Sequence, residues 1–285
     1  MSISYSDDEY ITSRTRILMR TKISKEITNL IFACESQNND KFIELFESDN
    51  SDPSIENNIL PKTAIESNNI EILSYLLQKG ANISNEDMYK SAFFYGTKIN
   101  MIKFLFDRGI DFVTNTKFIS RCINNADKND IVEFLLEQGM DPNKLLDANA
   151  PEKHLIDIAT KDYNQEIIEI LISHGADPSL STSRCLSFAI QTGEEKIIRL
   201  LLNNGAIPSS VTPKDLSIML GSKPRLSLIK FLVDQGFDFS MVNSVKFDRS
   251  YINEVCPVLF ELGVDPLQLI NIYDEYNEKE NEKRY

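Results

Sequence analysis

Histidine, a frequent side chain of catalytic and metal sites, is scarce in this chain: it occurs twice in 285 residues, at His154 and His174. His154 precedes an expected helix and His174 ends one, where a protonated imidazole interacts favourably with the negative helix end. The ten glycines stand singly, so none forms a glycine-rich phosphate loop, and no serine lies in a Gly-x-Ser-x-Gly setting. We therefore expect no enzyme activity, no catalytic residue, no cofactor and no metal ion.

Basic residues are also few. The chain has 30 Lys and Arg residues but 43 Asp and Glu residues, which gives a net charge of −13. A surface with this balance repels phosphate backbones and anionic lipid, so we expect neither nucleic acid nor a membrane as partner. No apolar run approaches the ~20 residues that cross a bilayer, and the start, MSISYSDDEY, has no basic segment followed by an apolar stretch. These absences predict a cytoplasmic protein, in the cell that makes it or in the cytosol of a host.

Cysteine is limited to four residues, Cys34, Cys122, Cys185 and Cys256, which are far apart in the sequence. They form no Cys-x-x-Cys pair and have no histidine at ligand spacing. A disulfide framework is typical of short secreted chains, whereas cysteines scattered through helical stretches are typical of small buried side chains. We expect these thiols to belong to the core.

One helix ending, by contrast, recurs along most of the chain. Before each of seven glycines, positions −8, −7, −5, −4 and −3 are almost always apolar. On a helix these positions form a stripe wider than a surface helix needs, which predicts helices covered on more than one side by stacked neighbours. The intervals between these glycines are 29, 30, 36, 30, 31 and 27 residues, and the glycines are Gly80, Gly109, Gly139, Gly175, Gly205, Gly236 and Gly263.

Each of these glycines is expected to end its helix in the left-handed conformation, which glycine adopts without a side-chain clash. Asn or Asp usually follows two positions later, and a proline in several links prevents the helix from continuing. Phe112 and Phe239 replace that proline, and we expect them to pack over the helix end. An eighth unit ends at Asn50 instead of glycine, and Glu47 at its position −3 suits an end repeat with one solvent-facing side.

A second, shorter apolar segment lies 16 residues before the glycine in several units, where it carries Ala64, Ala159 or Ala189. Each unit therefore predicts a short helix, a tight turn, a second helix and an extended link. The small alanine side chains would let the next unit approach closely.

Helix–turn–helix units that end in Gly-Ala-Asn at Gly80 and in Gly-Ala-Asp-Pro at Gly175 resemble ankyrin repeats. The resemblance covers residues 27–268 and implies an all-α, ankyrin-type α-solenoid of about eight repeats with short linking fingers. Residues 1–26 would then be a lead segment, and residues 269–285 a charged tail. The Ile-, Asn- and Lys-rich units are similar to the ankyrin repeats of large DNA viruses of amoebae.

The opening Thr-Pro-Leu-His of the family is missing from these units. Its histidine place holds Lys62, Asp157 and Ser187. Because that opening normally supplies hydrogen bonds between neighbouring repeats, we expect these repeats to be less tightly tied.

The resemblance implies a non-catalytic scaffold or adaptor that binds a partner protein, because a stacked array offers a long concave face without a deep pocket. Two alternatives stay open: a nucleic-acid-binding helical array, which the net charge of −13 disfavours, and a substrate adaptor for a ubiquitin ligase. We expect a monomer, and repeat architecture alone does not identify the partner.

The longest interval, of 36 residues, precedes Gly175 and is six residues longer than the next one. The extra residues fall in the link MDPNKLLDANAPEK, at 140–153. Insertions in repeat proteins go to loops on one face, which is often the binding face. Leu145, Leu146 and Asp147 are therefore the candidate partner-binding residues, although the two leucines could equally pack under the loop or extend a short helix.

Overall fold

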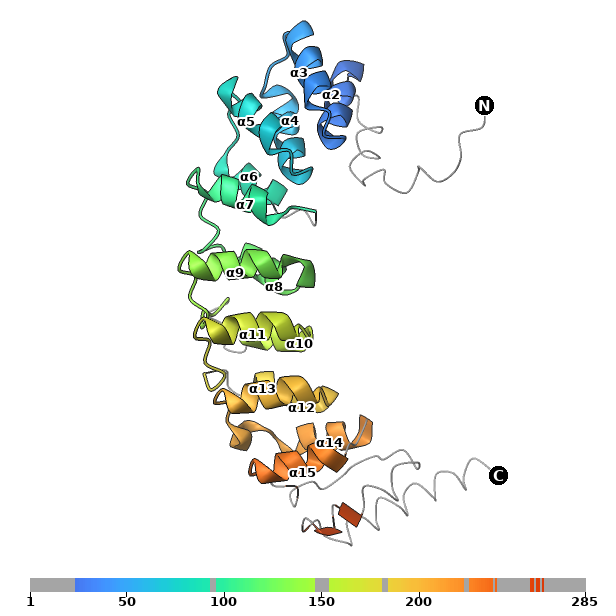
Figure 1. Ribbon diagram of the computed structural model, residues 1–285, viewed down its shortest axis with the longest axis vertical. Helices are drawn as coiled ribbons and strands as arrows, with labels where there is room; N and C mark the ends of the chain where they lie inside the picture. Colours follow the sequence, from blue (N-terminus) through green and yellow to red (C-terminus); the bar gives the residue numbers. More distant parts are fainter. Residues whose placement is uncertain are drawn as a thin grey trace, which may run out of the picture. The chain divides into compact units, whose positions relative to one another are not determined.

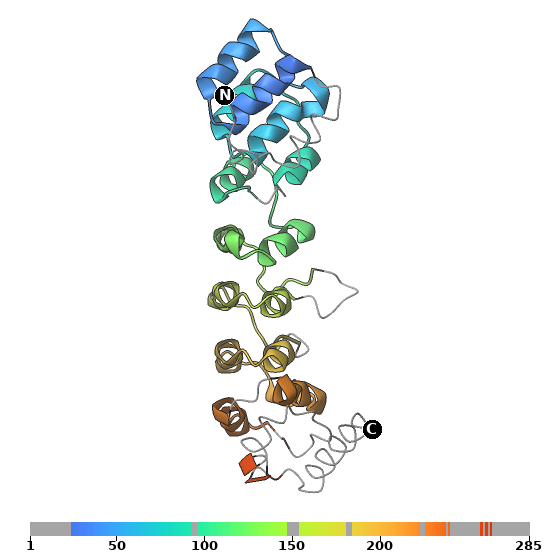
Figure 2. The same cartoon turned by 90° about the vertical axis from the view of Figure 1, so that its right-hand side faces the viewer.

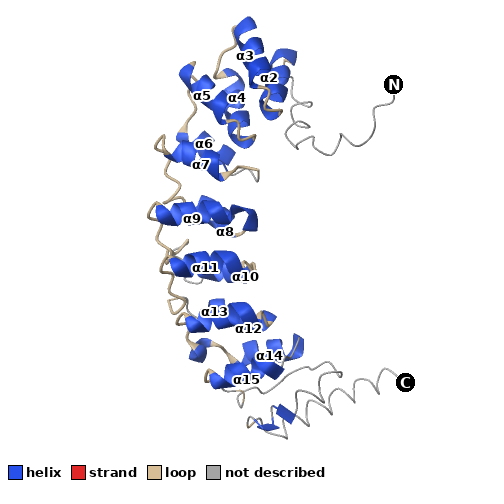
Figure 3. Cartoon of the chain, in the orientation of Figure 1, coloured by secondary structure: helices blue, strands red, loops and turns tan. Residues whose placement is uncertain are grey.

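The fold comes from a computed structural model, which describes residues 24–92, 96–146, 154–180, 184–222 and 226–237, with a few single positions between 239 and 263. Helices form the regular structure of these ranges, and no β-strand occurs in them; a single isolated bridge joins Leu145 and His154 (Figure 3). This confirms the predicted all-α class. The chain divides into two compact units, residues 1–111 and 112–285, which are described in turn.

Unit 1, residues 1–111, contains consecutive helix pairs, drawn from blue to cyan-green in Figure 1. The pairs are α2 (Lys25–Glu35) with α3 (Asn39–Ser48), α4 (Ile55–Glu66) with α5 (Ile70–Gln78), and α6 (Asn85–Ala92) with α7 (Ile99–Phe106). The first helices lie side by side, with α4 between α2 and α6, and each packs against the second helix of its own pair.

Unit 2, residues 112–285, continues the same alternation. Its pairs are α8 (Thr116–Ile123) with α9 (Asn129–Glu137), α10 (Leu155–Lys161) with α11 (Gln165–Ser173), α12 (Arg184–Thr192) with α13 (Glu195–Asn203), and α14 (Pro213–Ser222) with α15 (Leu226–Asp234). Short 3₁₀ turns precede α9 and α14, at η2 (Ala126–Lys128) and η3 (Pro208–Ser210). Within this unit the second helices α9, α11 and α13 form one column and the first helices a second column beside it (Figure 2).

Some predicted segments fall where the structure describes little or nothing. The helix pair expected before Gly263 is described only at a few positions, and the lead segment and the tail lie mostly or wholly outside the described residues. The domain boundaries at 26 and 268 therefore remain predictions.

The helix endings are as the sequence predicts. Gly175 has a φ of +92°, and its N–H donates to the carbonyl of Ile172 while the next N–H, of Ala176, donates to Leu171, both at 2.9 Å. These bonds satisfy the last carbonyls of α11, as the left-handed helix ending requires. The other six glycines also have positive φ, and so does Asn50, at +44°, which confirms the eighth unit that lacks a glycine.

The apolar stripe of the second helices is buried over only part of its predicted width. On α11, Ile167, Ile168 and Leu171 are fully buried, whereas Ile170 and Ile172 are half-buried. The same division holds on α5, α7 and α13. On α9 all five positions are buried, Phe134 and Leu136 included, as expected. Positions −8, −7 and −4 therefore form the core on all of these helices, whereas the expectation of a covered stripe is wrong for positions −5 and −3 of α5, α7, α11 and α13, which are only half-buried.

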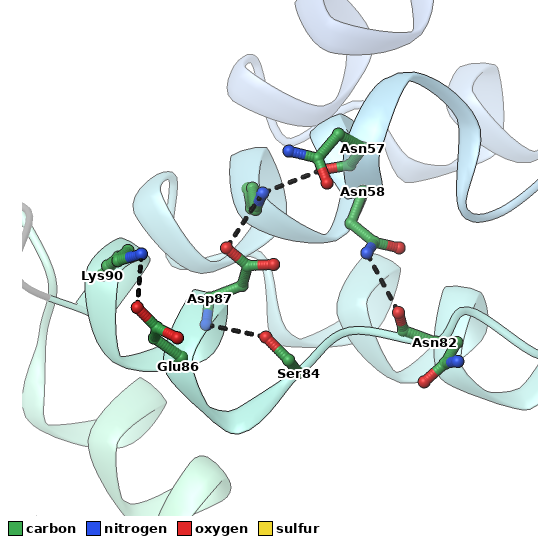
Figure 4. Close-up of polar contacts among 8 residues, drawn as sticks. Asn57, Asn58, Asn82, Ser84, Glu86, Asp87 and Lys90 are labelled. Carbon is green, nitrogen blue, oxygen red and sulfur yellow. Dashed lines mark hydrogen bonds and ion pairs between the residues drawn. The ribbon is translucent and has the colours of Figure 1, made fainter.

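The histidine place of the missing opening still carries contacts between repeats. In unit 1, Nζ of Lys62 on α4 lies 3.2 Å from Oδ1 of Asp87 on α6 (Figure 4). Oγ of Ser84 accepts a hydrogen bond from the N–H of Asp87 at 3.1 Å, so Ser84 closes the start of the helix that carries Asp87. In unit 2, Nε2 of Gln191 on α12 donates to Oγ of Ser187, at the histidine place, at 3.2 Å and to Oδ1 of Asp215 on α14 at 2.7 Å. Charged and amide side chains thus replace histidine in linking these neighbours.

Asparagines supply a second set of links, at the turns between paired helices. Asn69 caps α5, since its Oδ1 accepts from the N–H of Ile72 at 3.1 Å. Its Nδ2 reaches the preceding repeat, where it donates to the carbonyl of Cys34 at 3.1 Å and to Oδ1 of Asn39 at 2.7 Å. Asn39 in turn donates to Glu71 at 2.7 Å. One amide therefore caps its own helix and binds the neighbouring repeat.

The same arrangement recurs in unit 2. Asn164 caps α11 through the N–H of Ile167, at 3.2 Å, and donates to Oδ1 of Asn129 at 3.1 Å. Asn129 donates to Oε2 of Glu166 at 2.6 Å. Because both units use the same three positions, the link is a property of the repeat.

The start of α4 departs from ordinary helical geometry. Glu56, Asn57 and Asn58 have φ values of 47°, 57° and 62°, in the left-handed region that non-glycine residues avoid. Nδ2 of Asn58 donates to the carbonyl of Asn82 at 2.9 Å (Figure 4). The N–H of Asn82 donates to Oγ of Ser54 at 3.0 Å. Contacts with the link of the next repeat therefore help to hold this left-handed turn.

Candidate functional site

A groove runs along the first helices of unit 2. It has a volume of about 690 Å³ and crosses α8, α10 and α12, with one residue contributed by the link after α9. Eleven residues line it: Thr116, Lys117, Ser120, Asn124, Leu146, Asp157, Ile158, Lys161, Asp162, Arg184 and Phe188.

Helix caps set which side chains face this groove. Oδ1 of Asn115 accepts from the N–H of Phe118 at 3.0 Å, which fixes the first turn of α8. Phe118 and Ile119 then point into the core, and Lys117 and Ser120 remain on the open side. Buried and exposed positions alternate along the helix with its period. The pattern that turns some side chains toward the core therefore turns the others toward the groove.

On α10, the start of the helix is closed by a capping box. The N–H of His154 donates to Oδ2 of Asp157 at 3.3 Å, and the Asp157 side chain is almost fully buried. Oδ2 of Asp157 therefore accepts the hydrogen bond that closes the start of α10. Ile158 and Lys161, one and four positions further on, stand on the groove side.

The polar rim of the groove is mainly cationic. Each of the three repeats contributes one exposed cation: Lys117 from α8, Lys161 from α10 and Arg184 from α12. Among the residues that the structure describes, neither lysine forms an ion pair. Asp162 is the exposed carboxylate of the lining. The groove thus differs in sign from a chain whose net charge is −13.

The apolar part of the groove consists of Leu146, Ile158 and Phe188, which are all half-buried. Ile158 and Phe188 each precede the alanine of their first helix, Ala159 and Ala189. Sequence reasoning missed both residues, although this shared place in the repeat could have pointed to them.

The predicted binding residues in the long link have separate positions. Leu145 is 40% exposed, Leu146 lines the groove, and Asp147 lies outside the described residues. Neither leucine is part of a helix. Their role in binding a partner stays a prediction.

The base of this link is fastened to the repeats on both sides. Asn143 donates through Nδ2 to the carbonyl of Gly175 at 3.0 Å and accepts from the N–H of Asp177 at 2.8 Å. Nζ of Lys144 donates to the carbonyl of Val113 at 3.2 Å. These bonds hold Leu145 and Leu146 next to the groove.

Other side chains with chemical potential have structural roles. Nδ1 of His174 lies 2.9 Å from the carbonyl oxygen of Ile170, in the last turn of α11, as expected for a helix-end histidine. Cys34, Cys122 and Cys185 are buried thiols that form no disulfide within the described part of the chain, and Cys256 lies outside it. Burial raises the pKa of Cys122 to about 12, so this thiol stays protonated near neutral pH. Phe112 and Phe239 are also buried, as predicted.

Two further features are absent from the described ranges. No group of three or more His, Cys, Asp or Glu residues there could hold a metal ion. Within the same ranges, every helix is too short or too polar to cross a membrane.

Comparison with known proteins gives one match. The model of the family "Ankyrin repeats (3 copies)" matches residues 119–215, from α8 into α14, and this segment holds most of the groove. No curated protein matches the chain. The match confirms the ankyrin resemblance and the predicted all-α, ankyrin-type fold of helix pairs, whereas the similarity to viral repeats stays a prediction.

Proposed function

We propose that the protein is a non-catalytic scaffold that binds a partner protein in the groove of α8, α10 and α12, starting from the match of residues 119–215 to the ankyrin repeat family. Ankyrin repeats are in general protein-interaction modules. The observation that carries the proposal is the groove itself, in which an apolar floor is surrounded by a polar rim. That combination is characteristic of protein-binding surfaces.

The long link extends this surface. Leu146 is part of the groove, and Leu145 is exposed beside it. An exposed leucine next to a groove is suited to insertion into a partner, because burying it on binding removes apolar surface from water. We include Leu145, Leu146 and Asp147 in the proposed contact surface.

The alternative functions receive less support. Nucleic acid would require neutralisation of many phosphates, and the chain carries 13 more acidic than basic residues. A role as substrate adaptor for a ubiquitin ligase is compatible with a protein-binding groove, but no described residue favours it specifically. The groove lining contains neither histidine nor cysteine, so it offers no evident nucleophile with a base.

The proposal is tested by selecting binders from a display library of random peptides on the whole purified chain. Leu145→Asp with Leu146→Asp should weaken binding of the selected peptides by at least ~10-fold, about 1.4 kcal/mol. The melting temperature should stay near the parent's, because Leu145 is exposed and Leu146 is only half-buried.

A matched control is Ile170→Asp with Ile172→Asp on α11, where both side chains are half-buried and neither lines the groove. It should leave peptide affinity near the parent's in the folded fraction. Equal affinity of the parent and the Leu145/Leu146 variant would remove the link from the binding surface. Failure to enrich any peptide would argue against the scaffold function.

A further inference from the structure

The charges of the groove indicate what kind of partner it fits. Lys117, Lys161 and Arg184 come from three consecutive repeats and are all exposed at the rim. Asp157 is buried with Oδ2 bound to a backbone N–H, so Asp162 is the lining carboxylate that can face a ligand. The rim therefore has a local excess of positive charge on an acidic protein. An acidic ligand, which the rest of the protein would repel, is attracted there.

The arrangement also sets the dimensions of the ligand. Lys117 and Arg184 belong to α8 and α12, which are separated by α10. Packed helices lie about 8–10 Å apart, so these two cations are roughly 16–20 Å apart, a span of about six residues of extended peptide. Between them, Ile158 and Phe188 offer half-buried apolar surface.

From this geometry we propose that the groove binds an extended acidic segment of a partner protein, with carboxylates near both ends and one apolar side chain near the middle. The proposal rests on the proposed protein-binding function and adds the chemistry of the partner. The carboxylates pair with Lys117, Lys161 and Arg184, and the apolar side chain packs against Ile158 and Phe188. Opposite charge at the rim speeds encounter and excludes basic partners, which gives an acidic protein a selective site.

The test starts from the peptides selected on the whole chain, from a library of about twelve residues, twice the length that spans the rim. Selected sequences should be enriched in Asp and Glu on both sides of an apolar residue and depleted in Lys and Arg. Binding of labelled copies, measured by fluorescence anisotropy, should weaken as sodium chloride is raised, because salt screens exposed charge pairs.

Charge reversal then locates the contact. Lys117→Glu with Lys161→Glu should weaken the selected acidic peptides by at least about 10-fold, since two attractive contacts become repulsive. The matched control, Lys196→Glu with Lys230→Glu, makes the same change in net charge at exposed lysines of the second helices α13 and α15. It should change the affinity much less. Lys117→Gln with Lys161→Gln provides a milder pair if charge reversal lowers the melting temperature.

Four results would overturn the inference. If neutral or basic peptides are selected, or if the control pair weakens binding as much as the groove pair, the acidic specificity is wrong and the scaffold function stands. If no peptide is selected, the scaffold function fails and the inference fails with it. If a labelled single-stranded oligonucleotide binds and the groove pair abolishes that binding, the groove is a nucleic-acid site instead.

Discussion

Gly175 ends α11 with a φ of +92°, and no heavy atom lies within 4 Å of the place that a Cβ would take. The cost of a side chain there is therefore conformational and does not come from a steric clash. Gly175→Val should lower the free energy of unfolding by roughly 1–2 kcal/mol, because an L-residue is strained in the left-handed region. Urea denaturation measures this change.

Gly175→Asn is the control for that measurement, since asparagine tolerates the left-handed region better than valine and already occupies the equivalent place at Asn50. It should cost less than the valine variant. A valine variant with the parent's denaturation midpoint would contradict the helix-ending role of Gly175.

Asp215 connects two repeats through its carboxylate, and its stability contribution should depend on pH. Burial raises its pKa, but hydrogen bonds from the Thr212 side chain and N–H and from Gln191 outweigh that effect and hold the pKa of Asp215 below its usual value. A lowered folded-state pKa stabilises the fold above the unfolded-state pKa of about 3.9, and this stabilisation is lost as the pH falls through the folded-state value.

Asp215→Asn should therefore destabilise the protein at neutral pH, and the difference from the parent should shrink as the pH is lowered below about 4. Thermal melts over a pH series measure it, with Asp234→Asn, at an exposed position of α15, as the control that should change little. A difference that is independent of pH would show that the charge of Asp215 does not matter to the fold.

At the scale of the element, two second helices, α5 and α11, begin at asparagines that cap the helix and also reach the preceding repeat. Asn164 caps α11 and donates to Asn129, whereas the described hydrogen bond of Asn115 caps α8 only. Loss of an asparagine cap costs about 1 kcal/mol. Asn164→Ala should cost more than Asn115→Ala, because it removes both the cap and the link between repeats.

A double-mutant cycle separates the two contributions of Asn164. Asn129→Ala and Asn164→Ala, singly and together, should give a coupling of about 0.5 kcal/mol or more, since the two amides are in contact. Additive effects, or equal costs for Asn164→Ala and Asn115→Ala in urea denaturation, would mean that the amide link contributes nothing to stability.

At the scale of the whole molecule, the net charge of −13 should govern the response to salt. An excess of one sign destabilises a compact state through self-repulsion, and salt screens that repulsion. The melting temperature should therefore rise with moderate sodium chloride, and rise more for Lys196→Glu with Lys230→Glu, which adds negative charge. A fall with salt would show that ion pairs such as Lys62 with Asp87 outweigh the repulsion.

Sequence reasoning predicted the helix pairs of this molecule because their endings depend on local chemistry. A left-handed glycine after an apolar run specifies a helix end without reference to the rest of the chain, and Gly175 is an example. The contacts between repeats were harder to predict. The missing histidine suggested weak ties, yet Asn69 and Asn164 supply links from a different place in the repeat.

The groove could not be predicted as a unit from the sequence. Lys117 lies near the start of its helix and Lys161 at the end of its own, so they share no place in the repeat. Only the packing of α8, α10 and α12 brings them to one rim. Ile158 and Phe188 do share a place, but whether it faces solvent depends on how neighbouring repeats pack.

The residues that hold these repeats together are largely separate from those that would meet a partner. Asn129, Asn164 and Gly175 form caps and links, whereas Lys117 and Phe188 have no part in those bonds. Point mutations in the groove can therefore change which partner binds while the caps and links that hold the repeats together stay intact. A lineage carrying this chain could follow a changing target one substitution at a time, without passing through unfolded intermediates.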